Sequence, residues 1–168
     1  MPIEICDYDN GWPEAFAQIC TRVGPVLDTL VLRIEHVGST SVPGLAARPI
    51  IDLDVVIRQR SDLPAVIERL GTLDYVHQGD LGITGREAFR SVRYFDEPRH
   101  HLYVVGEDAS ELRRHLAFRD RLRADADVRE RYAALKREVA SRVGDDRAAY
   151  VSGKSAFVES VLTTIASA

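Results

Sequence analysis

Two acidic residues lie inside a strongly apolar stretch of the chain, and this placement constrains the fold more than any other feature. Residues 50–57 read IIDLDVVI, a β-branched and nearly continuous run that is typical of a central strand covered on both faces. Alternate side chains of a strand share a face, so Asp52 and Asp54 point the same way, with Cα atoms about 6.6 Å apart. Acidic pairs also occur at exposed strand ends, but the apolar flanks favour a functional pair, because buried charges need partners.

Such a pair is suited to a metal ion. Two like charges on one face repel each other unless a cation lies between them, and carboxylate oxygens are ligands that Mg²⁺ prefers. We therefore predict that Asp52 and Asp54 hold Mg²⁺ and act in catalysis.

A turn of small residues precedes this strand. Residues 38–44 read GSTSVPG, in which a glycine allows the backbone to approach a ligand closely and a serine supplies a hydroxyl group. Backbone N–H groups of such a turn can hold the phosphates of a nucleoside triphosphate while Mg²⁺ neutralises their charge. The residues of the turn that we predict to bind phosphate are Gly38, Ser39, Thr40 and Ser41.

The remaining patterns predict an α+β fold. Strands are expected at residues 3–5, 31–37, 50–57, 73–77, 88–95 and 101–105, the last two as an antiparallel pair. Helices are expected at about 13–30, at 62–70, from 108 onward, at 128–143 and at about 152–165. This order predicts a nucleotidyltransferase-like mixed sheet flanked by helices, followed by carboxy-terminal helices. We expect a single domain over 1–168, with the sheet core at about 1–106 and the helical part at about 107–168.

Composition limits the partners. The 168 residues are 45% hydrophobic and 29% charged, as in an ordinary globular chain that can bury a core without disulfides. The net charge of −4 excludes a strongly basic nucleic-acid surface but leaves room for a local basic pocket. Two cysteines at no metal-ligand spacing, with neither a signal peptide nor a membrane span in the sequence, predict a cytoplasmic protein without a membrane partner.

Basic residues supply further candidates for phosphate binding. The only two lysines each follow a tyrosine by four residues, so that each pair, Tyr132–Lys136 and Tyr150–Lys154, shares one helical face. Lysine suits phosphate, and tyrosine suits stacking or hydrogen bonding. Alternatively, the rings pack at the edge of the core while the lysine stems extend to water. Two arginines beside a glycine-rich loop are either phosphate ligands or ordinary surface residues: Arg86 and Arg90.

Longer segments of the chain resemble known families. A hydrophobic-Gly-Ser pattern, followed after twelve residues by Asp-Leu-Asp-Val, resembles the signature of the polymerase-β-type nucleotidyltransferase superfamily. Residues 8–13, 34–52 and 118–120 and the two Tyr-x-x-x-Lys runs resemble the GrpB family (UPF0157-like), over about residues 4–160. The resemblance implies the nucleotidyltransferase fold. GrpB-like domains also occur fused to dephospho-coenzyme A kinase, which implies a nucleotide or coenzyme context.

The superfamily resemblance implies a third carboxylate on a later strand, as a base or a metal ligand. The matching segment here, residues 100–104, reads HHLYV and contains no acid. His101 and Tyr103 share a face and could point at the acidic pair, His101 as a base or metal ligand and Tyr103 as a proton donor. Alternatively, the histidines merely complete the strand. Acids that could converge on the pair in the fold are Glu35, Asp80 and Glu87.

Two functions are consistent with these residues. The first is a Mg²⁺-dependent nucleotidyltransferase that binds a nucleoside triphosphate and passes a nucleotidyl group to an unknown acceptor. The second is an accessory or regulatory domain that binds a nucleotide or coenzyme-like molecule without turnover. An acid converging on Asp52 and Asp54 would favour the enzyme, and its absence would favour the binding domain.

Overall fold

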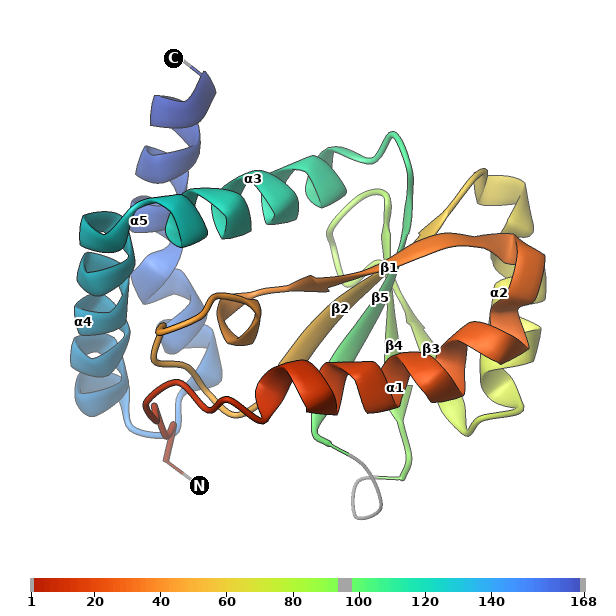
Figure 1. Cartoon of the computed structure of the whole chain (residues 1–168), viewed down its shortest axis with the longest axis horizontal. Coiled ribbons are helices and arrows are strands. Elements are labelled where there is room, and N and C mark those ends of the chain that lie inside the picture. Colours follow the sequence, from red (N-terminus) through yellow and green to blue (C-terminus); the bar gives the residue numbers. More distant parts are fainter. Residues whose placement is uncertain (1, 94–97, 167–168) are drawn as a thin grey trace.

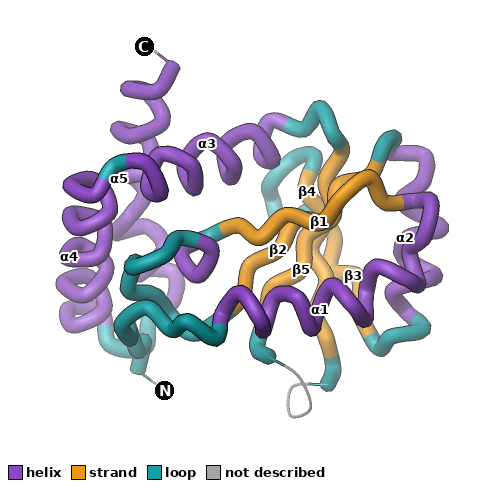
Figure 2. The backbone as a smooth tube through the Cα atoms, in the orientation of Figure 1, coloured by secondary structure: helices purple, strands orange, loops and turns teal. Residues whose placement is uncertain are grey.

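The computed structural model describes residues 2–93 and 98–166 (Figures 1 and 2). The strands are β1 (Val31–Val37), β2 (Ile51–Ile57), β3 (Tyr75–Gly79), β4 (Arg86–Ser91) and β5 (His100–Gly106). The helices are α1 (Trp12–Leu27), α2 (Leu63–Gly71), α3 (Ser110–Ala124), α4 (Ala126–Val143) and α5 (Arg147–Ala166). This is the α+β layout expected from the sequence.

The described strands form one mixed sheet in the order β1-β2-β5-β4-β3. The central strands β2 and β5 are parallel, and the other neighbouring strands are antiparallel. The register places Asp52 opposite His101 and Asp54 opposite Tyr103. On the other side of β2, Glu35 of β1 lies opposite Asp54.

The two faces of β2 have different neighbours. Leu53 belongs to the main hydrophobic core, which β2 forms with α1 and α2. Val56 packs on the opposite face with Leu112 of α3. Figure 1 shows α3 above the sheet and α1 below it. Asp52 and Asp54 alternate with Leu53 and therefore face the α3 side.

Helices α4 and α5 pack against each other and against α3, beside the turn that follows β1 (Figure 2). A second hydrophobic cluster joins this turn to the helices, through Val42 and Leu45 of the turn, Leu122 of α3 and Tyr132 of α4. The helix pair is thereby held next to the amino-terminal end of β2, where the acidic pair begins.

Most predicted elements are present, with shifted ends. The strand at 31–37 has the expected bounds, whereas β3 begins two residues later than expected and β4 begins two residues earlier. Residues 94 and 95 of the strand expected at 88–95 lie outside the described residues. Helix α5 begins at Arg147 rather than at 152, because the Asp146 side chain accepts a hydrogen bond from the Ala149 N–H (2.9 Å) and caps it.

The strand expected at residues 3–5 is absent. The Ile3 N–H donates to the Gly144 carbonyl (2.9 Å), and Cys6 forms an isolated bridge with Ala47. The side chains of Ile3 and Ile5 pack against the α4–α5 region instead of a sheet. The predicted strand was therefore wrong, because the alternating apolar side chains pack on helices and not within a sheet.

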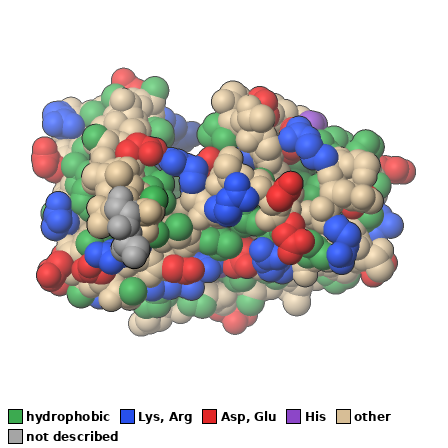
Figure 3. All heavy atoms as spheres, turned by 90° about the horizontal axis from the view of Figure 1, so that it is seen from above, with side chains coloured by type: hydrophobic (Ala, Val, Ile, Leu, Met, Phe, Trp, Pro, Cys, Tyr) green, Lys and Arg blue, Asp and Glu red, His purple; other side chains and the backbone are tan. Residues whose placement is uncertain are grey.

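The surface is mixed in charge. The face seen in Figure 3 carries acidic and basic side chains side by side, with neither sign forming a continuous patch. Among the helices of the described residues, none has the length and apolar character that crossing a bilayer would take.

Two helical glycines provide a matched test of the α4–α5 packing. A Cβ atom at Gly153 of α5 would lie 2.7 Å from Val139 Cγ1 of α4, whereas a Cβ at Gly24 of α1 would meet nothing within 4 Å. Val139 is buried and β-branched, so its side chain cannot turn away. We expect Gly153→Ala to lower the free energy of unfolding by about 1–3 kcal/mol through overpacking.

Gly24→Ala is the control and should change the free energy of unfolding by less than about 1 kcal/mol, because the better helix propensity of alanine is opposed by the steric effect of the following Pro25. Urea unfolding of both variants measures the difference. An increase in stability for Gly153→Ala would show that the two helices do not pack this closely.

Candidate functional site

A small pocket lies where the turn after β1 and the start of β2 meet the helix pair. Its volume is about 100 Å³. We call it the lysine pocket. Its lining includes six predicted site residues: Ser39, Asp52, His101, Lys136, Tyr150 and Lys154. These residues come from five separate segments of the chain, so the fold brings together groups that are up to 115 positions apart.

Asp52 and His101 form the acid–imidazole pair of this pocket. His101 Nδ1 lies 2.8 Å from Asp52 Oδ1, as their opposite positions in the parallel register require. A carboxylate can only accept a hydrogen bond, so Nδ1 carries the proton and, in the neutral ring, Nε2 keeps a free electron pair. The Asp52 side chain is 30% exposed, so solvent and ligands can reach it.

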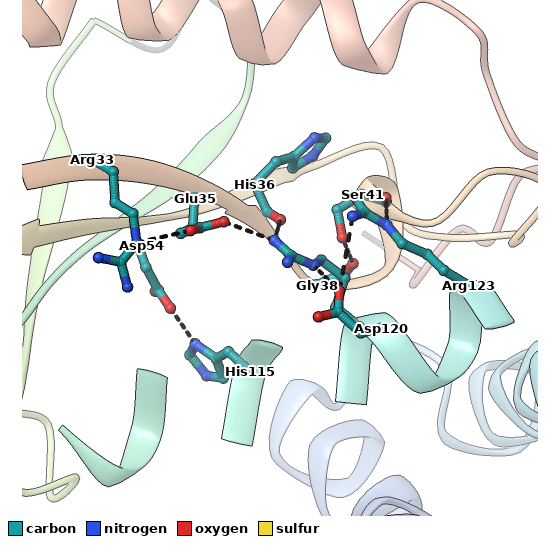
Figure 4. A network of polar contacts seen from close by, with 10 residues as sticks. Arg33, Glu35, His36, Gly38, Ser41, Asp54, His115, Asp120 and Arg123 are labelled. Atoms are coloured by element: carbon teal, nitrogen blue, oxygen red, sulfur yellow. Dashed lines mark hydrogen bonds and ion pairs between the residues drawn. The ribbon is translucent and has the colours of Figure 1, made fainter. Parts of the chain in front are cut away.

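Asp54, in contrast, is fully buried and bound to a histidine of α3. His115 Nδ1 lies 2.7 Å from Asp54 Oδ2 (Figure 4), and His115 Nε2 lies 3.1 Å from Glu111 Oε1. Burial lowers the pKa of His115, but the hydrogen bonds to the two carboxylates more than offset this and raise it to about 9. The ring is therefore an imidazolium ion held between Asp54 and Glu111. Burial raises the pKa of Asp54, and the hydrogen bond from His115 opposes that effect.

The turn after β1 is shaped around Asp52. Gly38 has φ 69°, and a methyl group there would overlap Asp52 Oδ2. Only glycine combines this backbone conformation with so close an approach. The sequence predicted that Gly38 lets the backbone approach a ligand; in the structure, the group against its backbone is the Asp52 carboxylate.

Both lysines bring their ammonium groups to the lysine pocket. Lys136 is 1% exposed and donates to Ser39 Oγ (2.9 Å) and to the Ala46 carbonyl. Lys154 Nζ lies 4.0 Å from the centre of the Tyr150 ring. Burial lowers the pKa of Lys136 to about 7 and that of Lys154 to about 8, while the charge of Asp52 opposes both shifts. Lys136 therefore does not extend to water, whereas Lys154 remains half-buried, with part of its side chain reaching solvent.

Three predicted phosphate ligands have structural roles instead. Tyr132 is buried, packed edge-on against Phe118 and stacked on Phe157, so its ring is not available to a base. The Ser41 hydroxyl donates to the Gly38 carbonyl (2.6 Å). The Thr40 hydroxyl donates to the carbonyl of Ile50 (3.3 Å). These two hydroxyl groups hold the turn in shape, although Thr40 also contributes to the wall of the lysine pocket.

Tyr103 lies beside Arg86, whereas Arg90, the other arginine of β4, lines a separate pocket. The guanidinium carbon of Arg86 sits 4.3 Å from the centre of the Tyr103 ring, and Arg86 Nε is buried without a partner among the described residues. Burial and the charge of Asp52 raise the pKa of Tyr103 to about 12, so its hydroxyl keeps its proton. Arg90 is exposed and lines a different pocket, with His101 at its border.

The expected third acid does not join the pair as a free carboxylate. Glu35 lies opposite Asp54, but Arg33 (3.0 Å) and Arg119 (2.9 Å) hold its two oxygens (Figure 4). Glu87 binds His77 (2.8 Å) and Arg60 (3.0 Å). Within residues 2–93 and 98–166, no three acidic, histidine or cysteine side chains converge as a metal site.

Two acidic side chains nevertheless suit a single Mg²⁺. Asp54 Oδ1 is buried without a hydrogen-bond partner among the described residues, although such an atom normally has one. It lies on the same face of β2 as the partly exposed Asp52 carboxylate. Carboxylate oxygens with water completing the shell are the ligands that Mg²⁺ takes. Asp52 and Asp54 are thus the residues that would hold the ion.

Sequence reasoning missed His115 and Glu111. The sequence carries a signal, because Glu111, His115 and Arg119 follow one another at i, i+4 spacing and form a polar stripe on α3. The stripe lies on the side of α3 that faces the sheet, since His115 binds Asp54 of β2 and Arg119 binds Glu35 of β1. Polar residues repeated along a face that must pack against a sheet indicate partners on that sheet.

The imidazolium ion between two carboxylates predicts a specific pH dependence of stability. A pKa raised from 6.5 to about 9 by folding contributes stability in full below pH 6.5, and this stability is lost as the pH rises through 9. We expect His115 to contribute a loss of about 2–3 kcal/mol across this range, measured as the difference in pH slope between the wild-type protein and the variant, because the lowered pKa values of Lys136 and Lys154 act in the opposite direction in both proteins. The His115→Gln variant should lack this loss. Urea unfolding at pH 6 to 9.5 checks it, and equal pH slopes for both proteins would contradict a charged His115.

Comparisons with known proteins were made for the sequence and for the fold. The family model described as GrpB protein matches residues 2–164. The UPF0157 protein YqkA of Bacillus subtilis is 32% identical over 157 residues, which are 94% of this chain and 45% of that protein. The dephospho-CoA kinase of Mycolicibacterium paratuberculosis is 27% identical over 178 residues, which cover 91% of this chain and 43% of the kinase. This chain thus spans less than half the length of either relative.

Solved structures agree with this fold. The crystal structure of the conserved protein GrpB from Enterococcus faecalis has a TM-score of 0.84 and 30% identity, and 94% of each chain is covered. The Cid1 poly(U) polymerase with bound MgGTP has a TM-score of 0.56 and 13% identity, over 82% of this chain and 45% of that one. The latter likeness confirms the nucleotidyltransferase-like fold predicted from the sequence. The family model and the sequence and structural relatives together place this chain in the GrpB family.

Proposed function

We propose that this chain is a nucleotidyltransferase that binds a nucleoside triphosphate in the lysine pocket. The observation that carries the proposal is the convergence of the Asp52–His101 pair and two ammonium groups, one buried and one half-buried, on one small pocket. A pocket with acid, imidazole and cations side by side can both hold phosphates and move a proton. The shared fold with the Cid1 poly(U) polymerase agrees with this chemistry.

The phosphates are the natural partners of Lys136 and Lys154. Lys136 is buried and Lys154 is half-buried, and burial lowers the pKa of each ammonium group. A phosphate anion nearby would stabilise the charged forms and restore the interactions that burial removes. Ser39 would add a hydroxyl group, since its Oγ already lies 2.9 Å from Lys136 Nζ.

Asp52 and Asp54 would hold Mg²⁺, which would neutralise phosphate charge when bound. The acceptor oxygen would form a bond to the α-phosphorus, and the bond from that phosphorus to the oxygen bridging the β-phosphate would break. Pyrophosphate would leave with the electrons of the broken bond. His101 Nε2 would take the proton of the acceptor, and Asp52 would hold the ring by accepting from Nδ1–H.

The way in which the acidic site is occupied favours a second function. His115 occupies Asp54 Oδ2, and the expected third carboxylate position on β5 holds Tyr103. Such a site could bind a nucleotide or coenzyme-like molecule without transfer, as an accessory domain does. The relative named dephospho-CoA kinase is consistent with a nucleotide or coenzyme context of this kind.

Nucleotide binding is tested by calorimetric titration with ATP, GTP, CTP and UTP, each with and without Mg²⁺. We expect Asp52→Asn to weaken Mg²⁺-dependent binding tenfold or more, because it removes a ligand charge. Lys154→Gln should weaken binding about tenfold through the loss of one charge-assisted hydrogen bond. Asp127→Asn is the control, because Asp127 is exposed on α4 and does not line the pocket.

Failure of the wild-type protein to bind any of the four nucleotides would overturn the transferase, and failure to bind coenzyme A as well would overturn the accessory domain. If binding is found, release of pyrophosphate in the presence of candidate acceptors separates the two. Release that His101→Gln abolishes, with nucleotide affinity retained, supports the transferase. Binding without release in any mixture supports the accessory domain.

A further inference from the structure

A second pocket borders the lysine pocket and has a different lining. Its volume is about 360 Å³. We call it the arginine pocket, after four residues that line it and come from four segments of the chain: Arg48, Arg90, Arg99 and Arg147. The same pocket also contains His100 and Phe89, and no acidic side chain of the described residues lines it.

These arginines have no partners among the residues that the structure describes. None of the four makes an ion pair, a side-chain hydrogen bond or a ring contact with another residue of the described parts of the chain. Among the described arginines outside the pocket, Arg58 alone shares this property. The others bind carboxylates, as Arg119 does, or backbone carbonyls, as Arg69 does, or lie over aromatic rings, as Arg86 does.

Gathering these cations opposes folding rather than supporting it. Burial lowers the pKa of Arg48, and the charges of Arg147 and Arg99 lower it further, while Tyr150 and Asp52 on the side of the lysine pocket oppose the shift. Like charges brought together repel each other unless counter-ions balance them. Among the described residues, no acidic side chain forms an ion pair with any of the four arginines. The arrangement is therefore one that an anionic ligand would relieve.

The arginine pocket opens toward the proposed reaction centre. Arg48, Ile50 and His101 line both pockets, and His101 binds Asp52 in the lysine pocket. A molecule held by the arginines would therefore lie next to the imidazole that is proposed to take a proton. This is the position of an acceptor, not of the nucleotide.

We propose that the arginine pocket binds the phosphate groups of a second small molecule, and that this molecule is the acceptor of the proposed transfer. Guanidinium groups bind phosphate through paired hydrogen bonds, and four of them suit a ligand with at least two phosphate groups. The pocket is closed to about 360 Å³, which fits a small phosphorylated molecule rather than a long polymer. The acceptor role rests on the proposed function, whereas phosphate binding stands on the arginines themselves.

Inorganic pyrophosphate is the probe for this pocket, titrated by calorimetry at fixed ionic strength without Mg²⁺. Arg147→Gln should weaken its binding about tenfold, and Arg90→Gln/Arg147→Gln should weaken it further. Arg58→Gln is the matched control: Arg58 is also exposed and without a partner among the described residues, but it lies outside the pocket. We expect that variant to change affinity less than twofold.

Equal losses in Arg147→Gln and Arg58→Gln would overturn the proposal, because they would indicate bulk charge rather than a site. Loss of binding in Lys154→Gln alone, with the arginine variants unchanged, would also overturn it, because the probe would then occupy the lysine pocket. Pyrophosphate binding that depends on Arg147, in a protein that binds no nucleoside triphosphate, would leave the arginine pocket standing and overturn the proposed function instead.

Discussion

The buried charge of Asp54 is the constraint on which the rest of the structure depends. A carboxylate with no exposed surface in the central strand is costly unless a partner reaches it. That partner is His115 of α3, which in turn needs Glu111. Helix α3 must therefore cross the sheet where its polar stripe meets the acidic pair. Because α4 and α5 pack on α3, their positions follow from the same interaction.

Asp52, unlike Asp54, is partly exposed and is held by the turn after β1 and by a histidine. Gly38 allows the turn after β1 to close over the Asp52 carboxylate, and His101 binds it from the neighbouring strand. The two acids of one strand thus have distinct environments, one fully buried and bound to an imidazolium ion, the other partly open to solvent. When two carboxylates share a site, differences in their burial and in the charges around them give the two groups different protonation behaviour.

Local patterns in the sequence predicted the local parts of this arrangement. The apolar run around Asp52 and Asp54 defined β2 and its two faces, and the i, i+4 spacing placed Tyr150 and Lys154 on one face of α5. The sequence of a strand alone, however, does not indicate which helix will cover each of its two faces. His115 reaches Asp54 across 61 positions, and no local pattern encodes that distance. The arginine pocket likewise depends on four segments whose meeting is a property of the whole fold.

Tyr132 shows how a correct pattern can carry a different meaning. It shares a helical face with Lys136, as predicted, and its ring lies 4.7 Å from Lys136 Nζ. The ring is nevertheless packed against Phe118 and Phe157, since α4 turns that face toward α3 and α5. Spacing establishes which side chains are neighbours, whereas burial decides whether they meet a ligand or a core.

The hydrogen bond from Lys136 to Ser39 joins residues 97 positions apart. Contacts this distant in sequence form only after the intervening chain has been ordered, because closing a long loop is unfavourable until many contacts compensate for it. The lysine pocket is thus completed only when the last helices dock onto the sheet. Any ligand that spans the turn and the helix pair binds the native state alone and stabilises the whole chain by mass action. Thermal stability, measured as ligands are added, is therefore a global reporter of occupancy at this one site.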